Sequence, residues 1–385
     1  MRAAIVTREW PPEVYGGAGV HVTELVKSLR ELTDVDVFCM GAERSDALAF
    51  ELASQPGLNP ALSVVATDVH MASAIVNSSA DVVHSHTWYA NLAGHLAAQT
   101  LGAPHIITAH SLEPRRPWKA DQLGGGYRVS SWIEADTYRA ADAVIAVSSG
   151  MRADILECYP FVDPSKVPVV YNGIDVSIFT PTHDESVLRK YGIDPQRPYV
   201  LFVGRITRQK GLIHLLRAAA SLPRDVQLVL AASSPDEKHI GDEVAAAVAG
   251  LKSSRPDDVV WIDVQVSKSE LIVLLTHAAV FACPSIYEPL GIVNLEAMAC
   301  GTAVVASAVG GIPEVVVDGV TGILVEYTPD DIAEFESNFA SALIDALDNP
   351  TRSAQMGSAG RARATDHFGW AAIARQTLDI YRSVK

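Results

Sequence analysis

The sequence predicts an α/β protein made of two doubly wound, Rossmann-like domains that face an inter-domain cleft. Short apolar runs, of the kind that form buried parallel strands, alternate with stretches of 3.6-residue apolar periodicity along almost the whole chain. The chain has 385 residues. That is more than one hydrophobic core usually organises, because single cores stop growing at about 250–300 residues. Two domains, each with a parallel sheet covered by helices, satisfy both observations.

Ten buried strands are expected, in two series of five. The first series is residues 3–7, 35–39, 81–85, 105–108 and 143–147, and the second is residues 199–203, 226–230, 259–262, 280–283 and 303–306. A polar segment that contains three prolines separates the series. We therefore expect a first domain at residues 1–171, a linker at 172–198 and a second domain at 199–369. The amphipathic residues 370–385 predict a terminal helix that packs back on the first domain.

Composition and charge narrow the class of protein. Hydrophobic residues make up 49% of the chain, which excludes a disordered protein. The formal net charge of −15 argues against a broad nucleic-acid surface, so no nucleic-acid partner is expected. The four cysteines are widely spaced, which favours reduced thiols, and no apolar run is long enough for stable membrane insertion. We expect a cytoplasmic protein; the sequence indicates no particular oligomeric state.

A glycine-rich loop follows the first expected strand. Gly16, Gly17 and Gly19 lie where backbone amides meet the start of a helix, and such a turn can receive a phosphate or a sugar closely. The loop is not GxGxxG, and no acidic residue closes the second strand, so a nicotinamide oxidoreductase is disfavoured. A glycine-rich connection that serves only tight packing is the alternative.

A basic turn follows the strand expected at residues 199–203. Arg205 and Lys210 lie after the carboxyl end of that strand, which is where doubly wound folds place ligands. Arginine offers a planar fork of donors and lysine a mobile point charge, and together they suit a diphosphate. A solvated surface turn is an equally simple interpretation.

The segment 283–307 carries the strongest signal. Glu288 precedes Pro289, and an apolar helix is expected to begin near Leu290, with the proline at its first position. Glu296 is expected two turns further along. Free amides are expected at Gly291, Ile292 and Val293. Two acids beside a helix N-terminus suggest a ligand with both hydroxyls and phosphates, such as a nucleotide sugar.

The order of these motifs resembles a known family. GGAG, HSH, TAHS, NGID, GRITRQKG and an E-x7-E spacing are similar to the retaining, two-domain (GT-B) nucleotide-sugar glycosyltransferases of the glycogen-synthase type. Among these, the actinobacterial short-form enzymes that use ADP-glucose show the greatest likeness. The resemblance implies that the first domain binds the acceptor and the second the nucleotide sugar.

The resemblance also implies roles for individual residues. The expected catalytic residues are Arg205 and Lys210 on the diphosphate, Glu288 beside the transferred sugar and His110 near the donor glucose. The expected donor-binding residues are Gly17, Asn172, Gly291, Ile292, Val293 and Glu296, with Glu296 on the ribose hydroxyls. One departure is that residues 14–17, Val-Tyr-Gly-Gly, lack the lysine of the Lys-Thr-Gly-Gly loop in long-form glycogen synthases.

A second basic stretch suggests the acceptor side. The expected acceptor-binding residues are Ser111, Lys119, Tyr127 and Arg128. Three of them lie in a long stretch that also holds a run of three glycines, residues 124–126. Basic and aromatic side chains there suit a phosphorylated acceptor, although a mobile surface loop is an equal alternative.

Several patterns are treated as decoys. Asp34 and Asp36 resemble a metal-binding DxD but come at the amino end of their strand, and His84 with His86 would need a third ligand to bind zinc. We therefore expect no metal and no cofactor. Glu288 and Glu296 could be the acid and nucleophile of a glycosidase, but eight helical residues rise about 12 Å, whereas retaining hydrolases hold their carboxyls about 5–5.5 Å apart.

Taken with the resemblance, the sequence predicts a retaining α-1,4-glucosyltransferase that moves glucose from ADP-glucose to α-glucose 1-phosphate, forming α-maltose 1-phosphate in α-glucan synthesis. The alternatives are elongation of an α-1,4-glucan from ADP-glucose, or a related transferase that uses another nucleotide sugar and a phosphorylated acceptor. A non-catalytic sugar-nucleotide sensor is disfavoured, because Arg205, Lys210, Glu288 and Glu296 are all present.

Overall fold

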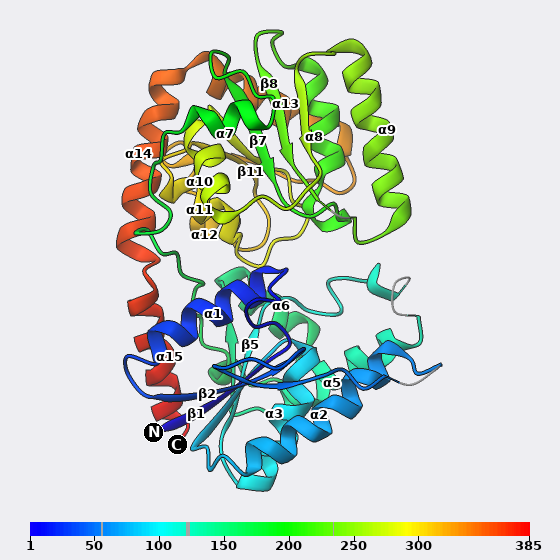
Figure 1. The fold of residues 1–385 in the computed structure, drawn as a ribbon, viewed down its shortest axis with the longest axis vertical. Coiled ribbons are helices and arrows are strands. Elements are labelled where there is room, and N and C mark those ends of the chain that lie inside the picture. Colours follow the sequence, from blue (N-terminus) through cyan, green and yellow to red (C-terminus); the bar gives the residue numbers. More distant parts are fainter. Residues whose placement is uncertain (55–56, 121–123, 234) are drawn as a thin grey trace. The chain divides into compact units, whose positions relative to one another are not determined.

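A computed structural model describes residues 1–385 except 55–56, 121–123 and 234. The chain forms two compact units (Figure 1). The first consists of Met1–Gly173 together with Trp370–Lys385, and the second of Ile174–Gly369. The two units are described separately.

The first unit is built on a six-stranded, fully parallel sheet with the order β3-β2-β1-β4-β5-β6. Its strands are β1 (Arg2–Thr7), β2 (Asp34–Met40), β3 (Leu48–Phe50), β4 (Val82–His86), β5 (His105–Ala109) and β6 (Ala143–Ala146). Alternate residues of β1 serve opposite faces of the sheet. Ala3 and Ile5 join one apolar cluster, whereas Ala4 and Val6 join another.

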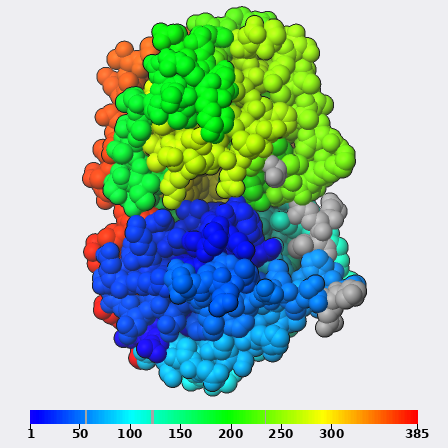
Figure 2. All heavy atoms as spheres, viewed as in Figure 1, coloured from blue at the N-terminus to red at the C-terminus, as the bar shows by residue number. Residues whose placement is uncertain are grey.

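Each of these clusters is closed by a different set of helices. The Ile5 face packs against α1 (Gly17–Leu29) and α15 (Trp370–Ser383), which lie side by side in Figure 1. The opposite face packs against α2 (Pro60–Val76), α3 (Trp88–Leu101) and α5 (Gly126–Ala140). A further helix, α6 (Ser149–Cys158), follows β6. On the face drawn in Figure 2, the surface of this unit is formed largely by early segments of the chain, in blue shades.

The second unit repeats this plan. Its parallel sheet has the order β12-β11-β10-β7-β8-β9 and consists of β7 (Tyr199–Val203), β8 (Gln227–Ala231), β9 (Val259–Ile262), β10 (Val280–Cys283), β11 (Val304–Ser307) and β12 (Gly322–Val325). One face is buried beneath α8 (Leu212–Ala218), α9 (Lys238–Ser254) and α13 (Ile332–Asp348). The remaining helices are α7 (Glu185–Lys190), α10 (Lys268–His277), α11 (Ile292–Ala299), α12 (Ile312–Val315) and α14 (Pro350–His367).

Both sheets have the same connectivity when their strands are counted from the start of each unit. The first strand lies next to the fourth, so the direction in which strands are added reverses between β1 and β4 and again between β7 and β10. Ligands of doubly wound folds bind outside the carboxyl ends of the strands at this switch point. The topology therefore marks the loops after β1, β4, β7 and β10.

The α/β class with two doubly wound sheets is confirmed. All ten expected strands are present, each within one or two residues of its expected ends. Two short edge strands, β3 and β12, were not expected. Within the segment expected as a linker, 172–198, the residues from Ile174 onward group with the second unit, where α7 packs against α10.

Two other expectations concern the start of α11 and the cysteines. Helix α11 begins at Ile292 with Gly291 as its N-cap, so the expectation of a start near Leu290 with Pro289 in the first turn is wrong. All four cysteines are free, with Cys39, Cys283 and Cys300 buried. Within the described residues, no helix is long and apolar enough to cross a membrane.

Candidate active site

The loop after β1 is organised by a buried acid. One oxygen of Glu9, Oε2, accepts hydrogen bonds from the backbone amides of Tyr15, at 2.9 Å, and Gly16, at 2.8 Å. A side chain at Gly19 would place its Cβ 2.6 Å from the same oxygen, so the loop closes tightly around the carboxylate. Gly17 is consequently fixed as the first residue of α1. The sequence analysis missed Glu9; an acid among glycine amides at a helix start was the available signal.

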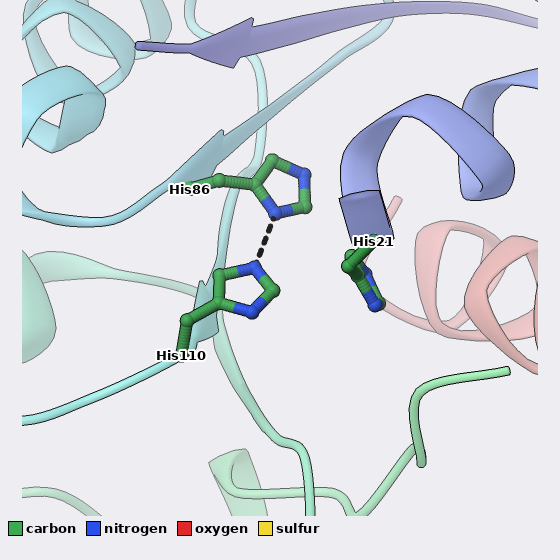
Figure 3. Close-up of side chains that lie close together, drawn as sticks. All are labelled: His21, His86 and His110. Carbon is green, nitrogen blue, oxygen red and sulfur yellow. Dashed lines mark hydrogen bonds between the residues drawn. The ribbon is translucent and has the colours of Figure 1, made fainter. Parts of the chain in front are cut away.

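Three histidines of the first unit lie together at the switch point (Figure 3). His21 comes from α1, His86 is the last residue of β4, and His110 directly follows β5. The Nδ1 atom of His86 and the Nε2 atom of His110 are 3.0 Å apart and share a hydrogen bond. The ring centroid of His21 lies 4.8 Å from that of His110 and 5.7 Å from that of His86.

These rings are held in the neutral form. Burial lowers the pKa of His21 to about 4. Burial, reinforced by the neighbouring rings, lowers the pKa of His86 and of His110 well below the ordinary value of 6.5. Neutral imidazoles keep one nitrogen lone pair each, and can accept hydrogen bonds or bind metals at neutral pH.

His84 and Asn172 have supporting roles. His84 is fully satisfied, because its Nδ1 lies 2.6 Å from the Tyr381 hydroxyl and its Nε2 2.7 Å from the Thr108 hydroxyl. This ring therefore ties β4 to α15 and β5. Asn172 is buried, and its amide is near enough to favour the charged form of His21, although no hydrogen bond of normal length and angle joins them.

The stretch expected to bind the acceptor is anchored by Glu113. Its carboxylate binds Arg116 at 2.6 Å and the Ser130 hydroxyl at 2.6 Å. The hydroxyl of Tyr127, in the first turn of α5, donates to the backbone oxygen of Glu113 at 2.8 Å. The Tyr127 side chain therefore ties α5 to the segment after β5. Of the expected acceptor residues, Arg128 is exposed, while Ser111 and Lys119 are partly exposed.

A second buried acid supports Glu113. Glu134 accepts hydrogen bonds from the Glu113 amide at 2.8 Å and from the Tyr159 hydroxyl at 2.5 Å. Burial and then the Glu113 carboxylate raise the pKa of Glu134 to about 8. Glu134 therefore carries a proton at neutral pH, which avoids two buried charges beside each other.

In the second unit, the two strongest sequence signals meet. The ammonium of Lys210, in the turn after β7, lies 2.6 Å from Glu288 Oε2, in the loop after β10. The Ser285 hydroxyl also donates to this oxygen at 3.3 Å. Burial opposes the charge of Lys210, but Glu288 and Cys283 outweigh it and raise the pKa of the lysine. A positive charge is thus fixed at the switch point.

Two further expected residues lie within electrostatic reach of Lys210. Arg205 lowers the pKa of Lys210, and Lys210 in turn favours the charged form of Glu296. Burial nevertheless raises the pKa of Glu296 to about 7. The Arg205 guanidinium is half-exposed and lies 2.7 Å from Asp236 Oδ1, a partner that the sequence analysis missed.

Two glycines allow these segments to approach. Gly211 has φ +63°, and a Cβ there would lie 2.0 Å from the backbone oxygen of Pro284. Gly310 has φ +53°, and a Cβ there would lie 2.0 Å from the backbone oxygen of Glu288. Any other residue would push the basic turn or the β11–α12 connection away from the Glu288 loop.

The N-terminus of α11 lies in the same cluster of the second unit. Gly291, Ile292 and Val293 occupy the N-cap and the first two helical positions. Asn294 is buried with neither amide atom hydrogen-bonded among the described residues, and its nitrogen would lie 2.7 Å from a Cβ at Gly291. Glu296 lies only one turn into the helix. Glu288 lies outside it, so helical rise does not measure the distance between the two acids.

Comparisons with known proteins identify the family. The family model described as "Glycosyltransferase Family 4" matches residues 15–178, and the one described as "Glycosyl transferases group 1" matches residues 183–363. The alpha-maltose-1-phosphate synthase of Mycolicibacterium smegmatis is 56% identical over 390 residues, and both chains are covered completely. This chain belongs to the alpha-maltose-1-phosphate synthase family of GT-B glycosyltransferases.

More distant relatives agree on the class of this transferase. A D-inositol 3-phosphate glycosyltransferase of Kineococcus radiotolerans is 33% identical over 329 residues, which cover 78% of this chain and 71% of the relative. The solved structure of sucrose-phosphate synthase from Thermosynechococcus elongatus is similar with a TM-score of 0.81 and 25% identity, covering 100% of this chain and 98% of the other. The transferase is thus a nucleotide-sugar hexosyltransferase, and the oxidoreductase alternative is wrong.

The residues expected in the active site form one cluster in each unit. In the second unit, Arg205, Glu288 and Glu296 each lie within electrostatic range of Lys210, near the start of α11. The first unit brings His110 next to His21 and His86, with Gly17 at the start of α1. Sequence reasoning missed His21, whose signal was a histidine on the apolar, sheet-facing side of an expected helix.

Asp34 and Asp36, which resemble a metal-binding DxD, belong to neither cluster of expected site residues. Asp34 begins β2 and Asp36 is its third residue, at the amino end of the sheet, and Asp36 forms a weak ion pair with Arg2 at 3.7 Å. In the described part of the chain, His21, His86 and His110 form the group whose ligand atoms lie close enough together to hold a metal ion.

Proposed function

We propose that the transferase moves glucose from ADP-glucose to α-glucose 1-phosphate with retention of configuration, forming α-maltose 1-phosphate for α-glucan synthesis. The observation that carries this proposal is the Lys210–Glu288 contact, with Arg205 and Glu296 in electrostatic range at the switch point of the second unit. The names of the relatives that are 55–56% identical over the full chain support the product.

The donor is assigned mainly to the second unit. Arg205 and Lys210 bind the diphosphate, the amides of Gly291, Ile292 and Val293 add the positive end of a helix, and Glu296 accepts hydrogen bonds from the ribose hydroxyls. Arg205 must exchange its contact with Asp236 for a phosphate, and Lys210 must share its ammonium between phosphate and Glu288. Gly17, His110 and Asn172 complete the donor contacts from the first unit.

In the reaction, the bond between glucose C1 and the diphosphate oxygen breaks while C1 bonds to the 4-hydroxyl oxygen of the acceptor. Negative charge grows on the departing ADP, and Arg205, Lys210 and the α11 amides stabilise it. The acceptor proton goes to the leaving phosphate oxygen on the same face of the sugar. Glu288 lies beside the transferred glucose, and its charge is already balanced by Lys210.

The acceptor is assigned to the residues after β5. Ser111, Lys119, Tyr127 and Arg128 offer hydroxyl groups and two cations to a sugar phosphate. Tyr127 and Arg128 lie in the first turn of α5 rather than in the expected loop, and Glu113 ties α5 to the segment after β5. A relative whose name gives D-inositol 3-phosphate as its substrate shows that phosphorylated acceptors occur among related enzymes.

A single assay tests the proposal. ADP release from ADP-glucose is followed with α-glucose 1-phosphate and, separately, with glycogen, and the product is characterised by NMR. We expect faster release with glucose 1-phosphate and an α-1,4-linked product. Preference for glycogen would instead assign elongation of α-1,4-glucan. The same assay with UDP-glucose, following UDP release, tests the donor, and a faster rate with UDP-glucose would assign a different donor.

A further inference from the structure

The three clustered histidines have the composition and geometry of a metal site. The nitrogen ligands of His21, His86 and His110 all lie within 4.8 Å of one another, and Figure 3 shows their rings converging from three separate segments. Nitrogen ligands on a tetrahedral Zn²⁺ lie about 2.0–2.1 Å from the metal and therefore about 3.4 Å apart. The His86–His110 pair, at 3.0 Å, already has nearly this spacing. Rotation of the His21 ring is the principal adjustment that a metal requires.

The hydrogen bonding within the cluster is incomplete. Neither nitrogen of the buried His21 makes a hydrogen bond of normal geometry among the described residues. Buried polar atoms are rarely left unpartnered unless a water, an ion or a ligand satisfies them. Both ring nitrogens of His84, two residues before His86, are hydrogen-bonded, to Tyr381 and Thr108. A purely structural role therefore accounts for His84 but not for His21.

We propose that His21, His86 and His110 bind one divalent transition metal ion, best matched by Zn²⁺, and that the bound ion inhibits glucosyl transfer. Three neutral imidazoles leave a fourth position of a tetrahedral ion open, and this ligand set suits Zn²⁺, Cu²⁺ or Ni²⁺ rather than Mg²⁺ or Ca²⁺, which prefer oxygen ligands. When the metal binds, the hydrogen bond between His86 and His110 breaks, and the ring that donates it moves its proton to the far nitrogen.

Inhibition follows from the position of His110 and rests on the proposed function. A metal-bound His110 can no longer offer its nitrogen to the donor glucose. Metal binding itself does not depend on which nucleotide sugar or acceptor the enzyme uses, so the two parts can fail separately.

The first experiment measures binding of the metal alone. Full-length protein, freed of metal by dialysis against a chelator, is titrated calorimetrically with ZnCl₂ and, in parallel, with MgCl₂. We expect one Zn²⁺ per chain, no Mg²⁺ binding, and at least about a tenfold loss of zinc affinity in His21→Gln and His86→Gln. His239→Gln, which changes an exposed histidine of the second unit, is the matched control and should bind zinc as the unchanged protein does.

A second measurement does not depend on the folding of any variant. Co²⁺ replaces Zn²⁺ in the unchanged protein, and its visible absorption should show the intense bands of a tetrahedral, nitrogen-ligated ion. The metal site would be overturned if these bands were absent or if the protein did not bind zinc. It would also be overturned if His21→Gln and His86→Gln bound zinc as tightly as the unchanged protein.

The inhibitory part is tested by the ratio of transfer rates with and without Zn²⁺ in each variant. We expect Zn²⁺ to lower the transfer rate at least about tenfold in the unchanged enzyme and in His239→Gln, and to lower it less in His21→Gln. Zinc that binds without lowering the rate would overturn the inhibition and leave the site. If ADP-glucose is not a substrate at all, the proposed function fails, while the binding and Co²⁺ measurements still decide the metal site.

Discussion

The ammonium of Lys210 lies 2.6 Å from a carboxylate oxygen of Glu288, a residue 78 positions away in the sequence. The contact joins the turn after β7 to the loop after β10, which are the two loops that flank the switch point of the second sheet. Both side chains are largely shielded from water, so their charges interact more strongly than a surface pair would. The carboxylate thus fixes the cation before any phosphate is bound.

Replacing Lys210 should impair the chemical step rather than substrate binding alone. In Lys210→Ala we expect turnover to fall about a hundredfold or more, because charge on the departing ADP loses one stabilising cation. Steady-state rates of ADP release, with donor and acceptor both saturating, measure this effect.

Arg208→Ala is the matched control for Lys210→Ala. Arg208 lies in the same basic turn but is exposed, and no role in the site is assigned to it. It should keep turnover within about twofold of the unchanged enzyme, as surface substitutions usually do. Near-normal turnover in Lys210→Ala would remove the leaving-group role, and equal losses in both variants would point to damage of the turn itself.

Arg205 should be sensitive to shape as well as to charge. Its guanidinium is held by Asp236 at 2.7 Å and can present a planar fork to phosphate oxygens, which lysine cannot. We expect Arg205→Ala to lose about a hundredfold in turnover and Arg205→Lys to lose less, though still about tenfold. Asp236→Asn, which releases the guanidinium, is expected to lower the KM for ADP-glucose. An unchanged KM in that variant would show that Asp236 does not compete with the donor.

Local sequence was sufficient to predict the buried strands. Continuous apolar runs identify parallel strands directly. The run at residues 199–203, for example, has the same ends in the structure as in the prediction. The short strands β3 and β12 were not predicted although both are apolar; their strand structure depends on pairing with a single neighbour, β2 and β11 respectively. The start of α11 was misplaced because Pro289 was expected at the first helical position. The N-cap is instead Gly291, which has φ +94° and where a Cβ would lie 3.3 Å from Glu288 Cγ.

The site was predictable where it followed strand ends and unpredictable where distant segments meet. Lys210 and Glu288 could be recognised separately, because each follows a buried strand, but their pairing depends on β7 lying next to β10. Likewise His86 lacked further metal ligands in its own segment. His21 and His110 reach it only through the packing of α1 and β5 around β4.

Removal of metal ions should not reduce the rate of transfer. Two cations, Arg205 and Lys210, and the start of α11 are assigned to the charge of the departing ADP, which is the task a divalent ion would otherwise perform. ADP release measured with and without EDTA should therefore be equal, or higher with EDTA if the purified enzyme carries zinc. Strict dependence on an added divalent ion, restored by Mg²⁺, would contradict this assignment.

Lys119 and Arg128, which are assigned to the acceptor, should distinguish a phosphorylated acceptor from a glucan. Lys119→Ala and Arg128→Ala remove the two cations assigned to the acceptor phosphate, so we expect the KM for glucose 1-phosphate to rise about tenfold in each. Activity toward a plain glucan should change much less. Rates with both acceptors, measured at several concentrations, provide the comparison, and equal losses on both would remove the phosphate contact.

Glu134 should make the stability of the first unit depend on pH. Its pKa is raised from 4.5 to about 8 by burial and by the nearby Glu113 carboxylate, so between these values the folded chain binds a proton that the unfolded chain does not. The unfolding free energy therefore decreases as pH rises through this window, by about 2–3 kcal/mol between pH 6 and pH 9.

Glu134→Gln isolates this contribution. Glutamine resembles the protonated acid, keeps an oxygen that can accept from the Glu113 amide and the Tyr159 hydroxyl, and cannot ionise. We expect the melting temperature of the variant to fall less between pH 6 and pH 9 than that of the unchanged protein, and to be the higher of the two at pH 9. Glu51→Gln, at an exposed position of the same unit, should leave the pH dependence unchanged. A variant that keeps the full pH dependence would show that Glu134 is ionised at neutral pH, and that the Glu113 loop is anchored by two charged carboxylates instead of one.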